Sequence, residues 1–118
     1  MNEKVIITVT SCWELKSFED VNPMDAFWKA FVDTDIWGVA SIEMTFRSIF
    51  TQYKNDPYFL SQLVMMLNNR YWLVLKSKRN LGIILTYQNI WNEALQYAEN
   101  TLQGGDLQNI KRMFDFYG

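Results

Sequence analysis

The longest apolar-rich stretch of the chain runs from Pro57 to Lys78 and predicts a central helix. At about 100° per residue, its large apolar side chains fill an arc of roughly 200°. This arc is wider than the apolar stripe of an ordinary surface helix, so we expect the helix to contact several neighbours. Asp56 marks its start, because an Asp side chain accepts from the free N–H groups of the first turn and proline suits the first helical position.

Three residues inside this helix depart from its pattern. Arg70 falls within the apolar arc, where an unpaired guanidinium is costly to bury, so it either snorkels to solvent or meets a carboxylate. We expect a buried Arg70 that pairs with Glu43 or Asp25. Met65 and Trp72 point into the polar arc, seven residues apart and hence on one side of the helix. Because Met and Trp are enriched where proteins meet, they form a candidate partner surface; the alternative is that another part of the chain covers them.

Helical spacing of apolar residues continues on both sides of this stretch. Cap and turn signals divide it into four further helices. The first covers about 23–33 and ends at a break over Asp33-Thr34-Asp35, where Asp35 or a neighbour caps a second helix that runs to about Lys54. The next covers 81–103, between a turn at Arg79-Asn80 and Gly104-Gly105, and a short last one covers 107–117 after Asp106. A two-residue break at Asn55-Asp56 should make the second and the central helix antiparallel neighbours. The segment 73–87 also fits a β-hairpin that turns at Ser77 to Asn80, and this alternative stays open.

Residues 4–11 alternate β-branched side chains and predict one strand near the N-terminus. A lone strand is unstable, so it must pair with a second copy of the chain, pair with another strand of this chain, or lie as an arm over helices. Because no second unambiguous strand is visible, we expect a homodimer in which two such strands pair across a two-fold axis. Trp13 and Phe18 are interpreted as anchors in an irregular connection that ends at Asn22.

The fold class that follows is mainly α, a compact antiparallel bundle of about five helices with a short N-terminal strand or extended arm. A chain of 118 residues is the size of one domain, here with a strand or arm over 1–22 and a helical core over 23–118. The alternative is an α+β fold in which a hairpin over 73–87 pairs with the N-terminal strand.

Few residues in the chain are suited to catalysis. There is no histidine, and the five glycines form no phosphate-binding loop, so we expect neither an enzyme nor a bound metal or other cofactor. Cys12 is the only cysteine, which excludes an intrachain disulfide and fits the reducing cytoplasm. The N-terminus lacks the apolar run of a signal peptide, and polar residues interrupt 57–78 too often for a membrane span.

The charge balance argues against a generic nucleic-acid binder, because the formal net charge is −2 and phosphate binding usually needs a basic face. Residues 1–56 hold nine acidic and five basic side chains, whereas residues 57–118 hold four acidic and six basic ones. A weak basic patch would use Lys76, Lys78, Arg79, Lys111 and Arg112. These cations either touch phosphate, which makes a small nucleic-acid-associated factor the rival function, or complement helix dipoles.

The run FLSQLVMMLNNRYW at 59–72 is followed by Trp91, Ala94, Tyr97-Ala98, Glu99-Asn100, Leu102 and Gly104. With these motifs the chain resembles an uncharacterised group of small helical proteins encoded by gut anaerobic bacteria and their mobile elements. The resemblance covers about residues 38–115. It implies no known activity, so it assigns no functional residue.

Aromatic residues are the informative excess, since they make up 16% of the chain and include five Trp. Such side chains dominate both protein cores and binding hot spots. The expected function is therefore a non-enzymatic protein-binding or regulatory module of the cytoplasm. The resemblance implies the setting of a mobile-element accessory protein.

Overall fold

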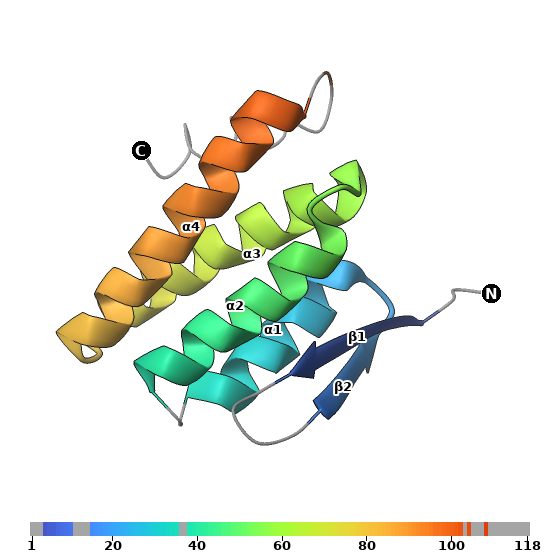
Figure 1. Ribbon diagram of the computed structural model, residues 1–118. Helices are drawn as coiled ribbons and strands as arrows, with labels where there is room; N and C mark the ends of the chain where they lie inside the picture. The colour runs from blue at the N-terminus through green and yellow to red at the C-terminus, as the bar shows by residue number, and fades with distance from the viewer. Residues whose placement is uncertain (1–3, 11–14, 36–37, 103, 105–107, 109–118) are drawn as a thin grey trace.

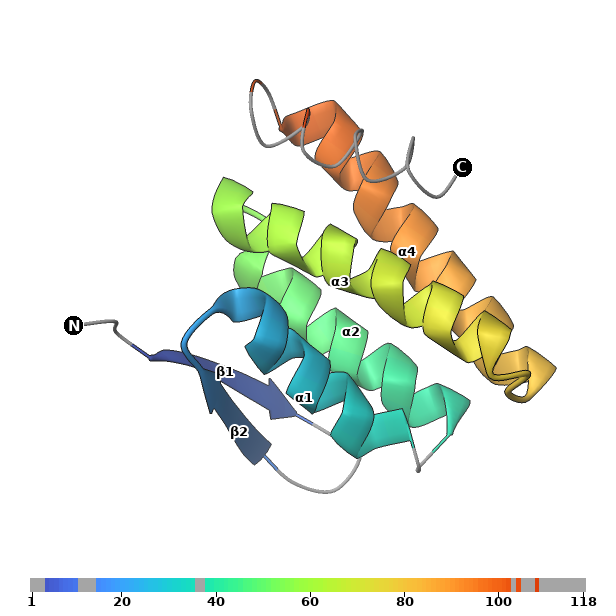
Figure 2. The same cartoon turned by 180° about the vertical axis from the view of Figure 1, so that it is seen from behind.

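The computed structural model describes residues 4–10, 15–35, 38–102, 104 and 108, which form an antiparallel β-hairpin followed by four helices (Figure 1). The elements are, in chain order, β1 (Val5–Thr10), β2 (Leu15–Asp20), α1 (Pro23–Asp35), α2 (Val39–Tyr53), α3 (Pro57–Lys76) and α4 (Leu81–Thr101). The hairpin lies against α1 and α2, on the side of the bundle away from α4 (Figure 1 and Figure 2). Nearly all of the predicted fifth helix lies outside the described residues.

The strand expected at the N-terminus is β1, and it pairs with β2 of the same chain in a register that sets Ile7 opposite Phe18. Its alternation has the predicted effect, since Ile7 and Val9 are buried. The interpretation of 15–20 as an irregular connection is wrong. The strand that β1 was expected to borrow from a second copy is supplied by its own chain, so the inference of a homodimer loses its premise.

Sequence analysis missed β2 because Lys16, Glu19 and Asp20 dilute its apolar pattern. Two ion pairs to α1 hold this strand: Lys16 contacts Asp33 at 2.9 Å, and Asp20 contacts Lys29 at 2.8 Å. The hydrogen bond from Lys29 also keeps the pKa of the Asp20 carboxyl below its ordinary value. The charged residues of β2, which are typical of a loop in the sequence, therefore attach this strand to α1.

The second edge of β1 faces α2. Gln52 donates to the backbone carbonyl of Thr8 at 2.8 Å, and the hydroxyl of Tyr53 lies 3.5 Å from the carbonyl of Ile6. Successive residues of a strand direct their backbone groups to opposite edges, so these two carbonyls face away from β2. α2 thereby covers an edge at which another strand could otherwise pair.

α1 is longer than predicted, because it runs through the segment 33–35 that was interpreted as a break. Thr34 is buried there, and its hydroxyl donates to the carbonyl of Ala30 at 3.1 Å, so the helix itself satisfies this polar group. α2 begins only after Gly38, whose φ of 95° favours glycine. The prediction that Asp35 or a neighbour caps this helix is therefore wrong, since the N-cap is Gly38 and no side chain caps it.

α3 starts at its predicted cap, and α4 starts at Leu81, where a helix was predicted after a turn. The side chain of Asp56 accepts from two N–H groups in the first turn of α3. Asn80 caps α4 in the same way, by accepting from the N–H of Gly82 at 2.7 Å. The segment 73–87 is thus two helices joined by a turn, and the hairpin alternative for it is wrong.

α3 is central, as its wide apolar arc predicts, because it packs against both α1 and α4. α2 also contacts α1 and α4 but has little contact with α3, so the predicted pairing of these two consecutive helices is wrong. A short turn reverses the chain without forcing the two helices to share a face. α1 is a full member of the core, with Phe27 and Phe31 completely buried.

Candidate functional site

Arg70 is buried inside the bundle, with 5% of its surface exposed. Its guanidinium lies over the rings of Trp28 from α1 and Tyr87 from α4, at 4.9 Å and 5.7 Å from the ring centres. Its Nε also donates to the hydroxyl of Tyr87 at 3.4 Å. One cation therefore links three helices through aromatic faces, an attraction that strengthens when water is excluded.

The two carboxylates expected to pair with Arg70 lie elsewhere. Asp25 is exposed in the first turn of α1, where its carboxylate accepts from the amide of Asn22 at 2.8 Å. Glu43 is exposed on the outer face of α2. The prediction of these partners is wrong, because a helical wheel shows which face of a helix a residue occupies but not which helix packs there.

Tyr87 is the buried partner of this cation. Burial raises the pKa of its hydroxyl above the ordinary value, an effect that the hydrogen bond from Arg70 opposes. Its ring also packs against Phe31, with 5.9 Å between the ring centres. The hydroxyl therefore stays protonated near neutral pH and acts as a hydrogen-bond acceptor rather than as a base.

Asn68 is a second polar residue buried in α3, two positions before Arg70. Neither its side-chain nitrogen nor its side-chain oxygen has a hydrogen-bond partner among the described residues. A buried polar group left in this state costs about 1–3 kcal/mol. Asn68 therefore marks a position where the core is not optimised for stability.

A hollow of about 340 Å³ opens at the C-terminal end of α3. We call it the tryptophan hollow; it is lined by Trp28 of α1 and by Asn69, Trp72, Leu73 and Lys76 of α3. Leu73 is 43% exposed, although its place in the apolar arc predicted core. Trp28 also contacts the buried Arg70, so one side chain lies both in the hollow and against the packed interior.

The tryptophan hollow contains only part of what the sequence predicted. Of the candidate partner surface it includes Trp72, whereas Met65 is half-buried and packs against the hydrophobic core. Of the basic patch it includes Lys76. The other members are Lys78 and Arg79, both exposed in the connection after α3, and Lys111 and Arg112, which lie outside the described residues.

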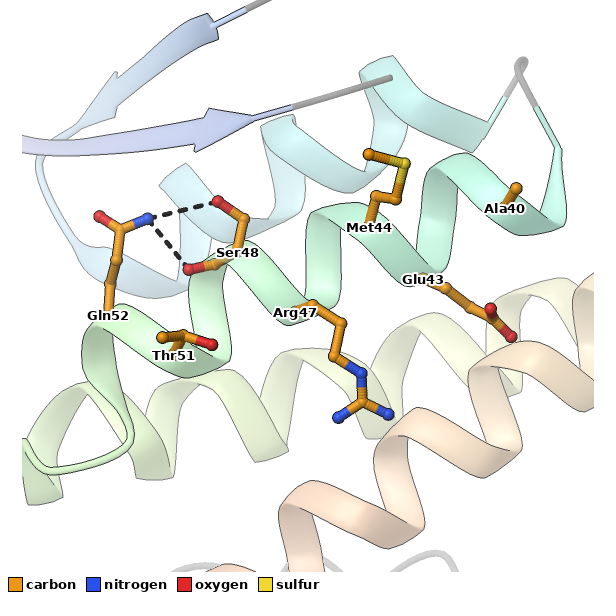
Figure 3. Close-up of a pocket in the computed structure, with 7 residues that line it drawn as sticks. All are labelled: Ala40, Glu43, Met44, Arg47, Ser48, Thr51 and Gln52. Atoms are coloured by element: carbon orange, nitrogen blue, oxygen red, sulfur yellow. Dashed lines mark hydrogen bonds between the residues drawn. The ribbon is translucent and has the colours of Figure 1, made fainter.

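A larger hollow, of about 670 Å³, lies along the outer face of α2 and is drawn in Figure 3. Two of its polar residues are already engaged within the chain. Both terminal nitrogens of Arg47 donate to the carboxylate of Glu93 on α4, and this hydrogen bonding raises the pKa of Arg47. Gln52 donates to the carbonyls of Thr8 and Ser48. This hollow therefore offers a partner fewer polar groups for hydrogen bonding than its volume suggests.

Sequence analysis did not connect Trp28 with the site. The available signal is that α1 carries Phe27 and Trp28 side by side, and Phe31 and Val32 one turn later, so the helix is apolar on two adjacent sides. Phe27 and Phe31 are buried in the core, while Val32 is exposed. A helix with two apolar sides has more apolar surface than its own fold needs, which is the pattern expected beside a contact surface.

Two features are absent from the part of the chain that the structure describes. No helix there is long and apolar enough to cross a membrane. Nor do three or more Cys, Asp or Glu side chains gather there as metal ligands would. Comparison of the chain with protein-family models, curated proteins and solved structures finds no match.

Proposed function

We propose that this protein is a non-enzymatic protein-binding module that contacts its partner through the tryptophan hollow. The observation that carries the proposal is the meeting of two Trp side chains, an exposed Leu73 and Lys76 on one surface. Trp residues contribute more to the binding energy of protein interfaces than most side chains do. Apolar side chains gathered at a surface are typical of sites where proteins meet.

The composition of the tryptophan hollow favours binding over catalysis. Its five lining residues include no carboxylate, thiol or hydroxyl that could serve as a general acid, base or nucleophile. Lys76 is exposed to solvent, whereas a nucleophilic lysine is usually enclosed in a hydrophobic pocket. The side chains of the hollow are suited to holding another surface and not to changing a substrate.

The cellular setting of this proposal rests on the sequence. A single cysteine fits a reducing compartment, which supports the cytoplasm. The resemblance over about residues 38–115 supports an accessory protein of a mobile element. In that setting the module acts by occupying a surface of another protein.

Copurification from the cells that encode the protein tests the proposal. Tagged wild-type protein, Trp72→Ala and Tyr58→Ala are recovered with and without nuclease. Tyr58 is the matched control, because it is an aromatic residue of α3 that is 51% exposed at the other end of the helix. We expect the wild type and Tyr58→Ala to retain a protein partner after nuclease treatment, and Trp72→Ala to lose it. Recovery that depends on nucleic acid would favour the rival function instead.

A further inference from the structure

We infer that the partner of the tryptophan hollow is an acidic protein segment that places an apolar side chain in the hollow, an inference that rests on the proposed function. The hollow itself supplies the apolar contact, through Trp28, Trp72 and Leu73. The acidic character of the partner follows from the charges around it.

The first observation is the charge of the segment that supplies four of the five residues lining the hollow. No Asp or Glu occurs between Asp56 and Glu93, while Arg70, Lys76, Lys78 and Arg79 all lie in that stretch. The stretch comprises the whole of α3 and the first part of α4. A protein with a net charge of −2 therefore has one region in which every formal charge is positive.

The second observation is how the chain balances its cations. Each of the five cations that precede this stretch contacts a carboxylate or the face of an aromatic ring. The pairs are Lys4 with Glu19, Lys16 with Asp33, Lys29 with Asp20, Arg47 with Glu93, and Lys54 with Phe50 and Tyr97. Within the stretch, Arg70 lies on the rings of Trp28 and Tyr87. Lys76 and Lys78 differ, because they are exposed and form neither an ion pair nor a ring contact with any described residue.

These two lysines lie where a partner would meet them. Lys76 lines the tryptophan hollow, and Lys78 follows two residues later in the connection after α3. Carboxylates beside the apolar side chain of a bound segment would balance both cations. Such rim charges act mainly on selectivity and on the rate of association, so binding should weaken as salt is added.

Nucleic acid fits these observations less well, although bases also stack on Trp. Phosphate backbones are bound by many cations at once, and here only two lysines are left unbalanced in the described part of the chain. The nine acidic residues in 1–56 would repel a long polyanion. A short acidic segment meets the two lysines without extending over the acidic half of the protein.

The test is a selection of random peptides displayed on phage against the full chain, followed by affinity measurements on the enriched peptides. We expect the peptides to share an apolar residue flanked by Asp or Glu, and to shift the indole N–H signals of Trp28 and Trp72 in NMR spectra. Lys76→Glu combined with Lys78→Glu should raise Kd at least about tenfold. The matched control, Lys4→Glu combined with Lys54→Glu, makes the same charge change away from the hollow and should leave Kd nearly unchanged.

The outcomes separate the inference from the function on which it rests. Peptides that need Trp72 but are neutral or basic, or that bind the Lys76→Glu and Lys78→Glu variant equally well, would overturn the acidic partner and leave the binding module standing. If no peptide binds in a Trp72-dependent way, the proposed function fails as well. Oligo-dT that competes for the same indole signals at similar affinity would reject a protein partner. Circular dichroism of each variant checks that it is folded, which we expect because all four lysines are at least partly exposed.

Discussion

The two ends of α3 use aromatic side chains in opposite ways. At the N-terminal end, the ring of Phe59 packs against Tyr53 and Phe27, with 4.8 Å and 6.3 Å between ring centres, and Phe27 is completely buried. At the C-terminal end, Trp28 and Tyr87 surround a buried cation, and Trp28 and Trp72 line a hollow. The first arrangement closes the core, while the second leaves two Trp side chains lining a hollow at the surface.

What separates these two ends is the charge around the rings. The N-terminal end is capped by Asp56, and its three rings contact one another. The C-terminal end has Arg70 within the aromatic cluster and Lys76 beside it, and α3 itself contains no Asp or Glu. An excess of aromatic residues therefore does not by itself distinguish core from the proposed contact surface, and the two ends differ instead in the charges beside the rings.

The largest effect is expected at the closed end. Phe27→Ala should lower the free energy of unfolding by about 3–5 kcal/mol, because it removes a completely buried ring and leaves a cavity. Urea denaturation followed by circular dichroism measures this. Tyr58→Ala, one residue from Phe59 but exposed, should stay within about 0.5 kcal/mol of the wild type. Similar losses for both variants would show that the aromatic cluster is not the source of stability.

A substitution in the middle of α3 should raise the free energy of unfolding instead of lowering it. Asn68→Leu is expected to raise the free energy of unfolding by about 1–3 kcal/mol, because it removes a buried amide that has no hydrogen-bond partner among the described residues. Asn69→Leu is the neighbouring control, since Asn69 is only half-buried and lines the hollow. A destabilised Asn68→Leu variant would mean that the amide is satisfied in solution, for example by a buried water.

The buried cation at the open end can be tested without removing its charge. Arg70→Lys should cost about 1–2 kcal/mol, because an ammonium is more strongly hydrated and cannot lay a flat face on Trp28 and Tyr87 together. Arg47→Lys makes the same change at an exposed ion pair and should cost less than about 0.5 kcal/mol. If the two substitutions have equal effects in thermal melts, the ring contacts of Arg70 add nothing to stability.

Each end of α3 also has a tyrosine whose pKa is raised by burial, Tyr53 at the closed end and Tyr87 at the open end. Above the ordinary pKa of 10.0, the unfolded chain loses these protons while the folded protein retains them, so stability should fall as the pH rises further. Urea denaturation between about pH 8 and about pH 11 measures the loss. Tyr87→Phe should reduce this pH dependence more than Tyr53→Phe, because Tyr87 is buried and Tyr53 only half-buried. An unchanged slope in both variants would assign the loss to other groups.

Much of α3 could be predicted from the sequence because its signals are local. The Asp56-Pro57 start, the wide apolar arc and the position of Arg70 within it are all properties of a single helix. Partners across the fold were not predictable in this way. The ring contacts of Arg70 depend on α1 and α4 packing against α3, and β2 is a strand largely because β1 and α1 hold it. Only part of the tryptophan hollow could be predicted for the same reason, since Trp72 lies in α3 and Trp28 lies in α1.

Apart from the control variants, the smallest loss of stability is expected for Trp72, the residue on which the proposed function depends most. Trp72→Ala should lower the free energy of unfolding by less than about 1 kcal/mol, because Trp72 is only half-buried at the edge of a hollow and is not enclosed by core. The same variant should lose the peptides selected by the wild type, whereas Phe27→Leu, a mild change in the closed core, should retain them. Urea denaturation and peptide binding on one preparation give both values. A loss of about 3–5 kcal/mol, the cost of removing a core aromatic residue, would mean that Trp72 belongs to the interior, and the contrast between the two ends of α3 would disappear.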